Sequence, residues 1–306
     1  MSSAKVVLLT GATGFVGQHL ARHMLAEGWQ VHAVARPSSA AERRTSLATV
    51  QWHLHDGDTS GLIAIMAAIR PQVVIHLAAR FIAEHTSDDV DELIRSNILF
   101  GTQLLEAMAA NEIRHLINTG TSWQHYNNEA YNPVCLYAAT KQAFESLARY
   151  YVEVRRITVT NLVLTDTYGP DDPRKKLFWA LRDSAHTGRE LSMSPGEQFI
   201  DLVYIDDVVK AYMMAVDRML GGSGSGMEYF GVSSGCAMPL RDLVAKYAQV
   251  TGLTPNVKWG GRPYRGREMF RPWSGVAGLP GWAAAVPLEE GLCRMEGVHV
   301  AGTSRQ

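Results

Sequence analysis

The sequence predicts an α/β protein in which helices cover both faces of a parallel sheet, with a smaller lobe formed by the C-terminal half. Two observations support this prediction. Apolar runs typical of buried strands alternate with helical stretches up to residue 170, as expected for consecutive β-α-β units with right-handed crossovers. The alternation weakens after Tyr168-Gly169-Pro170, where polar turns and glycine-rich loops follow.

The strands and helices of the first half follow from apolar patterns. Residues 6–10 form a continuous apolar run, which is typical of a strand buried on both faces of a parallel sheet. Val16, Leu20 and Met24 then recur at helical spacing, and Gly28 is a stop signal. The same reasoning predicts further strands at 31–35, 73–77, 116–119 and 157–164, and helices around 62–69, 93–108 and 137–154.

The second half carries weaker signals. Residues 171–176 are polar and turn-rich, and residues 221–226 have the composition of a flexible loop. The stretch after Arg262 is rich in Gly, Pro and Trp and has little helix signal. We therefore expect a smaller, irregular second lobe with a frayed end after about residue 298.

The composition argues against several classes of partner. Lys plus Arg numbers 29 and Asp plus Glu numbers 30, so a net charge of −1 gives no electrostatic support for a nucleic-acid or membrane-surface partner. No window of about 18 uncharged apolar residues predicts a transmembrane helix. Three widely separated cysteines form no disulfide framework, which favours a reducing, cytoplasmic location. His53, His55 and Asp56 are interpreted as ordinary side chains, so no metal is expected.

Glycines at 11, 14 and 17 stand between the first strand and the first helix, where a glycine pattern is informative. A pyrophosphate can rest on the free N–H groups at the N-terminus of such a helix. Gly11 would permit the tight turn, Gly14 the approach of the phosphates, and Gly17 close packing of helix and strand. The alternative is a glycine-rich turn without a ligand. The turn thus predicts a Rossmann-type dinucleotide site that also includes Thr13, Phe15 and Val16.

The end of the second strand indicates which dinucleotide binds. An acid there accepts a hydrogen bond from a ribose 2′-hydroxyl, whereas an Arg accommodates a 2′-phosphate. Arg36 therefore favours NADP(H), with NAD(H) as the alternative, and Ser38 and Ser39 would add hydroxyl donors. Arg36 could instead stack on the adenine or be solvated. Asp58 could contact the adenine amine or be an ordinary loop aspartate. The remaining predicted cofactor contacts follow the third apolar run of the sheet: Leu77, Ala78 and Ala79.

Tyr137 and Lys141 are predicted to be catalytic. They are four residues apart at the start of a helical stretch, so their side chains share one helix face. A phenol has a pKa near 10, and a neighbouring ammonium favours the phenolate, which would make Tyr137 an acid/base near neutral pH. The hydroxyl of Thr121, at the end of the preceding strand, can hydrogen-bond the same substrate oxygen. A surface helix pair is the alternative for the tyrosine and lysine.

Together these motifs resemble the extended short-chain dehydrogenase/reductase superfamily and, within it, the nucleotide-sugar epimerase/dehydratase branch. The resemblance implies that Tyr137 is the acid/base and that Lys141 holds the nicotinamide ribose and tunes Tyr137. It also implies that Thr121 binds the reacting oxygen and that Asn97 shapes the central helix near the cofactor. The resemblance covers most of the chain and rests on the glycine turn, Asn97-Ile98-Leu99-Phe100-Gly101-Thr102, Thr121, Tyr137 with Lys141, Tyr168-Gly169-Pro170 and residues 201–209.

The resemblance also implies how the chain is divided. Residues 1–170 would form the NADP-binding Rossmann domain, to which a return segment at about 200–220 belongs. Residues 171–199 and 227–298 would form the substrate-binding lobe, and residues 299–306 a tail.

Two further features are expected from the same branch. Residues 279–282 and 288–292 resemble its closing helix. Members often dimerise through two long helices, represented here by 93–108 and 137–154, so a homodimer is expected.

Departures from the residues typical of this branch reduce the number of reactions that the chain could catalyse. Sugar 4,6-dehydratases carry Asp-Glu directly after the strand-end Thr, whereas Ser122 and Trp123 stand here, which argues against that reaction. Asp166 replaces an asparagine that commonly contacts substrate, and Ile200 replaces an Arg of the return segment. Ser122, Trp123 and Asp166 nevertheless remain candidate substrate-binding residues.

A cluster of arginines in the second lobe offers a replacement for the missing Arg. Arg265 and Glu268 best match the branch's pattern of an Arg followed by an acid, which contacts nucleotide ribose and diphosphate. The alternative is a solvated basic loop. Residues around Tyr126, Glu197 and Arg265 also resemble reductases of deoxysugar nucleotides of the CDP-abequose synthase type.

The leading hypothesis is therefore an NADPH-dependent reductase of a keto group, at C4, of a nucleotide-linked 4-keto-6-deoxy sugar. The first alternative is an NAD-dependent nucleotide-sugar 4-epimerase with the same residues. A second is a non-catalytic Rossmann protein that senses dinucleotide redox state, which would have no need of Tyr137 and Lys141. A third, a reductase of small lipophilic ketones, would have no use for Arg265 and Glu268.

Overall fold

The computed structural model describes residues 5–37 and 47–298, and its centre is a seven-stranded parallel sheet. The strand order β11-β6-β5-β4-β1-β2-β3 reverses direction between β1 and β4, so the carboxyl ends of these two strands form the topological switch point at which α/β sheets bind ligands. The predicted doubly wound parallel fold is confirmed. The strands are β1 (Val6–Thr10), β2 (Gln30–Ala35), β3 (Gln51–Leu54), β4 (Val73–His76), β5 (His115–Thr121), β6 (Thr158–Leu164) and β11 (Met227–Val232).

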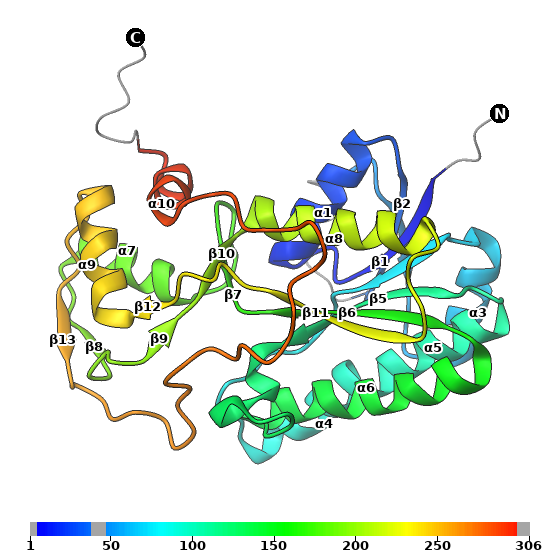
Figure 1. Ribbon diagram of the computed structural model, residues 1–306, viewed down its shortest axis with the longest axis horizontal. Coiled ribbons are helices and arrows are strands. Elements are labelled where there is room, and N and C mark those ends of the chain that lie inside the picture. The colour runs from blue at the N-terminus through cyan, green and yellow to red at the C-terminus, as the bar shows by residue number, and fades with distance from the viewer. Residues whose placement is uncertain (1–4, 38–46, 299–306) are drawn as a thin grey trace, which may run out of the picture.

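Helices cover both faces of this sheet (Figure 1). In β1, Val7 and Leu9 pack into the core on one face while Leu8 packs into the core on the other, which explains why the run is apolar throughout. On the Val7 face lie α1 (Phe15–Ala26) and α8 (Ile205–Leu220), and on the Leu8 face lie α3 (Thr59–Ile69), α5 (Phe100–Ala110) and α6 (Leu136–Arg155).

The predicted helix at 93–108 has an irregular centre. It consists of α4 (Val90–Ile94), a π-helical turn (Arg95–Leu99) and then α5 without a break. π-Helical turns often mark functional sites, and this one contains the buried Asn97.

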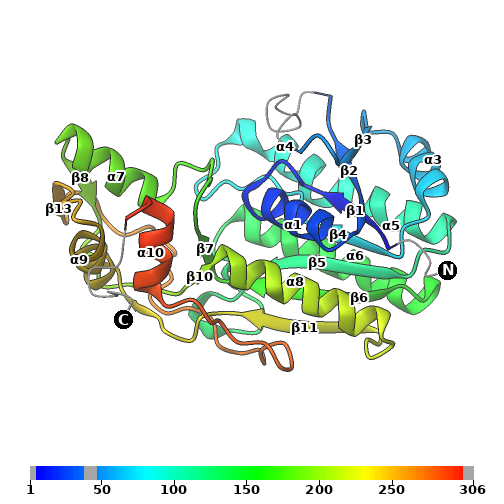
Figure 2. The same cartoon turned by 90° about the horizontal axis from the view of Figure 1, so that it is seen from above.

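The smaller lobe is more regular than predicted (Figures 1 and 2). In α9, Leu240, Leu243, Val244 and Tyr247 form one buried stripe, a helical spacing that could have been recognised in the sequence. The lobe contains the helices α7 (Leu177–Thr187), α9 (Leu240–Thr251) and α10 (Leu288–Glu296) and the strand pairs β8 (Leu191–Met193) with β13 (Val257–Trp259) and β9 (Phe199–Ile200) with β12 (Met238–Pro239).

Two details of the predicted division require correction. Residues 227–232 were assigned to the lobe, but they form β11, which pairs with β6 in the main sheet. Of the two segments expected to form the closing helix, only 288–292 is helical, in α10, whereas 279–282 forms a turn. The predicted tail at 299–306 lies outside the described residues.

The two lobes are joined by strands and by stacked side chains. The strand β7 (Asp166–Tyr168) pairs with β10 (Leu202–Tyr204) at the junction (Figure 2). The ring of His125 stacks on Trp273, with centroids 3.4 Å apart, and Arg267 lies 4.3 Å from the centre of the Tyr126 ring. These contacts hold the loop after Arg262 against the Rossmann domain.

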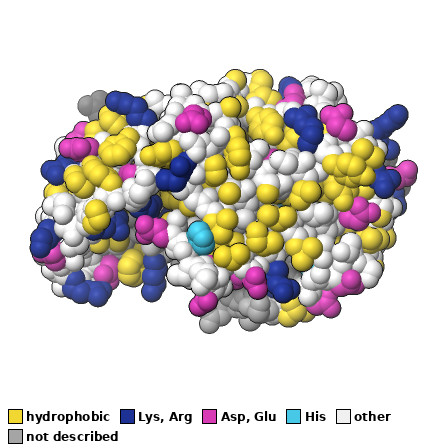
Figure 3. All heavy atoms as spheres, turned by 90° about the horizontal axis from the view of Figure 1, so that it is seen from below, with side chains coloured by type: hydrophobic (Ala, Val, Ile, Leu, Met, Phe, Trp, Pro, Cys, Tyr) yellow, Lys and Arg dark blue, Asp and Glu magenta, His cyan; other side chains and the backbone are white. Residues whose placement is uncertain are grey.

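The outer face of α4 to α6 keeps several hydrophobic side chains exposed (Figure 3). They are Ile94, Leu99, Leu147, Tyr150 and Val154. Among the helices in the described part of the chain, none has the length and apolar character needed to cross a membrane.

Candidate active site

The glycine turn brings three chain segments into contact at the switch point. Gly11 has a left-handed φ of +74°, and a Cβ on it would lie 2.6 Å from the backbone nitrogen of Ala78. A Cβ on Gly17 would lie 2.8 Å from the Cα of Ala12 and closer still to the carbonyl oxygen of Gly11. Only glycine therefore allows β1, α1 and the end of β4 to approach this closely.

This turn fits a dinucleotide. Gly14 occupies the N-cap of α1, and no side chain of the described residues caps that end of the helix. The unpaired N–H groups of the first turn and the positive end of the helix dipole thus remain available to a phosphate. Thr13 stands in the same turn. Phe15 and Val16 begin α1 and pack into or against the core, with the Arg174 guanidinium 4.5 Å from the centre of the Phe15 ring.

The loop after β4 is held against the turn by Thr10. The backbone N–H of Leu77 donates to the Thr10 carbonyl at 3.2 Å, and the N–H of Ala78 donates to its hydroxyl, also at 3.2 Å. The same hydroxyl shares a 2.7 Å hydrogen bond with His76. Burial, with a smaller contribution from Lys141, lowers the pKa of His76 to about 3, so this imidazole is neutral beneath the site. Of the predicted residues, Leu77 and Ala78 thus border the glycine turn, and Ala79 follows them in the chain.

The side chain of Asn97 forms hydrogen bonds to two different segments of the chain. Its side-chain oxygen accepts from the backbone N–H of Arg80 at 2.7 Å, and its amide donates to the Arg80 carbonyl at 3.0 Å and to the Thr140 hydroxyl at 2.9 Å. It therefore joins the loop after β4 to α6 beside Lys141.

The two predicted adenosine contacts already have partners within the chain. Arg36 is exposed and forms an ion pair with Glu92, at 3.6 Å. Asp58 caps the N-terminus of α3 by accepting from the N–H of Gly61 at 3.2 Å and from the Ser60 hydroxyl, and these bonds lower its pKa. A structural role for Asp58 is thus observed, and its contact with adenine stays a prediction. Ser38 and Ser39 lie outside the described residues.

Tyr137 and Lys141 lie in the first two turns of α6, as predicted. Lys141 is buried, and the edge of the Phe81 ring packs against Tyr137 with centroids 5.0 Å apart. Thr121 ends β5, where its hydroxyl accepts a hydrogen bond from the N–H of Trp123 at 3.3 Å and keeps its own proton for another acceptor.

The electrostatics of Tyr137 differ from the prediction. Burial raises the pKa of its phenol above the ordinary value, with Cys135 adding to the rise and Arg174 opposing it. Burial also acts on Lys141 and lowers its own pKa to about 8. Tyr137 therefore holds its proton at neutral pH.

A buried chain of polar side chains links Lys141 to Thr121. Glu145, one helical turn beyond Lys141, raises the pKa of the lysine and accepts a hydrogen bond from the Gln124 amide at 3.0 Å. The Gln124 oxygen in turn accepts from the backbone N–H of Thr121 at 3.0 Å. Glu145 thus supports both the charge of Lys141 and the position of Thr121.

Replacing Glu145 by Gln should lower the upper pH limit of activity. The wild-type activity is expected to fall as pH rises through about 8, where Lys141 loses its proton. Without the carboxylate the pKa of Lys141 falls further, so the loss of activity at high pH should begin about one pH unit lower. A pH profile of kcat measures the shift. Glu153→Gln, an exposed residue of the same helix, is the control. A Glu145→Gln variant whose activity falls at the same pH as that of the wild type would contradict the role given to Glu145.

A cavity of about 1040 Å³ lies between the two lobes. Phe81 forms part of its wall and also packs against both Trp123, at 5.5 Å, and Tyr137, which connects the cavity to the predicted catalytic pair. All five predicted substrate residues line it: Ser122, Trp123, Asp166, Arg265 and Glu268.

Basic side chains surround this cavity. The Arg265 guanidinium lies 5.7 Å from the centre of the Trp123 ring, while the backbone N–H of Arg265 donates to Glu268 at 3.3 Å. Lys176 lies 3.7 Å from Asp166. Arg174 and Lys176 were not selected from the sequence, where they fall in a segment interpreted as a polar turn. The signal that could have identified them is their position four and six residues after Pro170, at the end of the Tyr168-Gly169-Pro170 motif.

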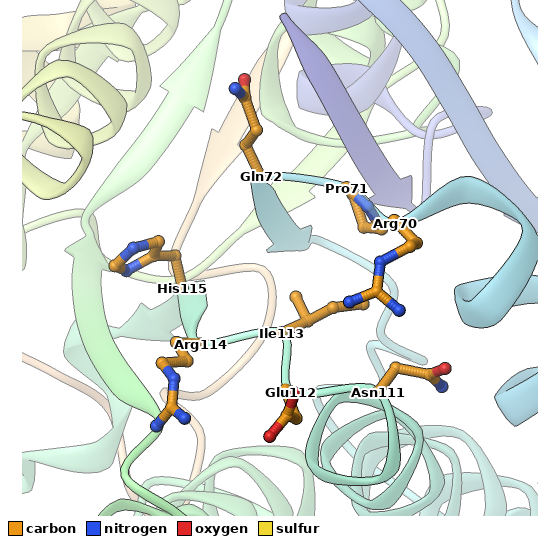
Figure 4. A pocket seen from close by; sticks show the side chains of 8 residues that line it. All are labelled: Arg70, Pro71, Gln72, Asn111, Glu112, Ile113, Arg114 and His115. Atoms are coloured by element: carbon orange, nitrogen blue, oxygen red, sulfur yellow. The ribbon is translucent and has the colours of Figure 1, made fainter.

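A second, smaller cavity of about 240 Å³ lies at the opposite end of the strands from the glycine turn (Figure 4). It is formed where β4 and β5 begin, whereas the glycine turn follows the end of β1. None of the predicted site residues lines it. Its lining is Arg70, Pro71, Gln72 and residues 111–115. The described residues contain no group of three or more His, Cys, Asp or Glu side chains arranged to hold a metal.

Comparison with known proteins shows which class of protein the chain resembles. The chain is 26% identical over 294 residues to a CDP-abequose synthase of Salmonella muenchen, which covers 95% of this chain and 97% of that protein. It is 27% identical over 310 residues to a UDP-glucose 4-epimerase of Mycolicibacterium smegmatis, with coverage of 94% and 96%. The UDP-glucose 4-epimerase from Brucella ovis, solved in complex with NAD, has the same fold, with a TM-score of 0.83 at 20% identity and coverage of 97% and 100%.

These relatives are nucleotide-sugar enzymes built on one dinucleotide-binding fold. The profile of the NAD dependent epimerase/dehydratase family matches residues 7–225, and the chain belongs to this family. The predicted family, the Rossmann-type fold and the assignment as an NAD(P)-dependent enzyme are therefore confirmed, and both the reductase and the epimerase hypothesis are represented among the relatives.

Proposed function

We propose that the protein is an NADPH-dependent reductase of the C4 keto group of a nucleotide-linked 4-keto-6-deoxy sugar. The observation that carries this proposal is the Tyr137 phenol beside an inter-lobe cavity with basic walls. Reduction of a ketone needs a proton donor of this kind, and the diphosphate of a nucleotide sugar needs cations such as Arg174, Lys176 and Arg265. The CDP-abequose synthase relative supports the same reaction class.

The residues of the chain then have distinct roles. NADPH, when bound on the glycine turn, supplies the hydride that reduces the carbonyl carbon. Thr121 donates a hydrogen bond to the carbonyl oxygen and fixes its direction, and Tyr137 gives that oxygen its proton as the alcohol forms. The Lys141 cation, supported by Glu145, stabilises the phenolate that remains until solvent returns the proton. One ketone, one hydride and one proton thus give one alcohol and NADP⁺.

The choice of NADPH rests on Arg36. Its exposed guanidinium follows β2, where a 2′-phosphate is recognised in this fold, and the segment offers no acidic residue for a 2′-hydroxyl. Ser122 and Trp123 line the cavity at the places where a 4,6-dehydratase requires an acid and a base, which further supports simple reduction.

Purified protein incubated with NADPH and a panel of nucleotide-linked 4-keto-6-deoxy sugars tests the proposal. Loss of NADPH absorbance together with formation of the reduced sugar is expected for at least one substrate. No oxidation of NADPH with any member of the panel would contradict it.

The second candidate function is 4-epimerisation of a nucleotide sugar, favoured by the identity to UDP-glucose 4-epimerase over nearly the whole chain. In that case Tyr137 would first remove and later return the proton of the C4 hydroxyl. Protein isolated with stoichiometric, non-exchanging NAD and interconverting UDP-glucose and UDP-galactose without added NADPH would select this function over the reductase.

We further propose that two copies of the chain associate through the exposed hydrophobic face of α4 to α6 (Figure 3). Light scattering after size exclusion should report a dimer for the wild type and a monomer for Tyr150→Glu. Leu54→Glu, at an equally exposed apolar residue on β3, should stay dimeric. A monomeric wild type would contradict the proposal.

A further inference from the structure

Two arginines from different strands converge on one glutamate beside the dinucleotide turn. Arg36 follows β2, Arg80 follows β4, and Glu92 lies on α4. The Arg36 Nη1 lies 3.6 Å from one carboxylate oxygen of Glu92, and the Arg80 Nε lies 3.3 Å from the other. A single carboxylate thus contacts two guanidinium groups, and the carboxylate of Asp89 also lies within electrostatic reach of Arg80.

The cluster is held in a way that leaves its charges accessible. The Arg80 backbone is fixed by both ends of the Asn97 amide, whereas 46% of the Arg80 side chain is exposed. Arg36 and Glu92 are exposed by 66% and 43%. Ion pairs this exposed are weak, so a competing anion can displace the carboxylate.

The cluster also lies where an adenosine ribose is expected. The end of β2 recognises the ribose in this fold, and Arg80 lies two residues after Ala78, which borders Gly11. Guanidinium groups bind phosphate through paired N–H donors, and two that already share one anion are arranged to share another.

We propose that Arg80 is the second cation for the 2′-phosphate of NADP(H), and that Glu92 is a counter-ion that the phosphate must displace. Glu92 thereby sets the preference between NADP(H) and NAD(H): its carboxylate competes with the 2′-phosphate but not with a 2′-hydroxyl. The inference rests on the proposed function, in which Arg36 recognises this phosphate.

Calorimetric titration of NADP⁺ and of NAD⁺ into the purified protein tests the inference without relying on activity. Glu92→Gln removes the competing charge at constant shape, so it should tighten NADP⁺ binding by about three- to ten-fold and leave NAD⁺ binding unchanged. Arg80→Gln should weaken NADP⁺ binding by about ten-fold, again with little effect on NAD⁺. Asp91→Asn, a neighbouring acid that forms no ion pair with a described residue, is the control for general charge effects.

The outcomes separate this inference from the proposed function. A wild type that prefers NAD⁺ would contradict the proposed cofactor, yet Glu92→Gln should still improve NADP⁺ binding relative to the wild type if Glu92 competes. Glu92→Gln that leaves NADP⁺ affinity unchanged, or that alters both dinucleotides alike as Asp91→Asn does, overturns the role of Glu92. Equal losses for both dinucleotides in Arg80→Gln overturn the role of Arg80.

Discussion

Tyr137→Phe should lower kcat by about 10³-fold while the protein stays folded and binds NADP⁺ as before. The substitution removes only the hydroxyl, and the ring keeps its contact with Phe81. In the proposed reaction this phenol gives its proton to the alkoxide formed when hydride reaches the carbonyl carbon. Without it, the proton must come from water, which is not held in place beside the carbonyl oxygen as the phenol is.

The measurement is steady-state kinetics with the substrate found in the panel, together with calorimetric titration of NADP⁺. Tyr150→Phe, an exposed tyrosine of the same helix, is the matched control and should keep wild-type rates. A Tyr137→Phe enzyme that retains most of its kcat would assign proton transfer to another group.

Gly17→Ala should destabilise the protein and disrupt the dinucleotide site together. The new methyl group would lie 2.8 Å from the Cα of Ala12 and nearer still to the Gly11 carbonyl oxygen, and both are backbone atoms that cannot rotate away. Overpacking of this kind costs about 1–3 kcal/mol, so the free energy of unfolding should fall by that amount. Moving the turn away from α1 should also weaken NADP⁺ binding by more than about ten-fold, because the phosphates depend on the close approach of this backbone.

Gly61→Ala is the matched control. Gly61 also lies in the first turn of a helix, but its added methyl would be 3.9 Å from the Asp58 carboxylate and would make only an ordinary contact. That variant should be as stable as the wild type or up to about 1 kcal/mol more stable, with unchanged NADP⁺ binding. Chemical denaturation and calorimetry measure both quantities. Equal behaviour of the two variants would contradict the role given to Gly17.

The sheet and the glycine turn could be predicted because local patterns determine them. An apolar run such as residues 6–10 can only be a strand covered on both faces, and the three glycines are required by contacts within a single β-α unit. The i, i+4 spacing of Tyr137 and Lys141 likewise fixes their common helix face.

Other features depend on contacts between distant segments, which a single sequence does not contain. The raised pKa of Tyr137 arises from burial beneath Phe81 and from Cys135, and the lowered pKa of Lys141 arises from burial in the finished core. The prediction that Lys141 lowers the tyrosine pKa considered the pair alone and omitted desolvation. Arg80 was also missed, because its meeting with Glu92 and Arg36 appears only when β2, β4 and α4 are assembled.

A crystal structure of the protein with NADP⁺ and a nucleotide-linked sugar tests the central claim most directly. We predict that the Tyr137 hydroxyl lies about 2.6–3.2 Å from the C4 oxygen of the sugar and faces the nicotinamide ring, with Thr121 on the same oxygen and the diphosphate among the basic residues of the inter-lobe cavity. A Tyr137 hydroxyl turned away from the nicotinamide, with the sugar bound elsewhere, would contradict the account.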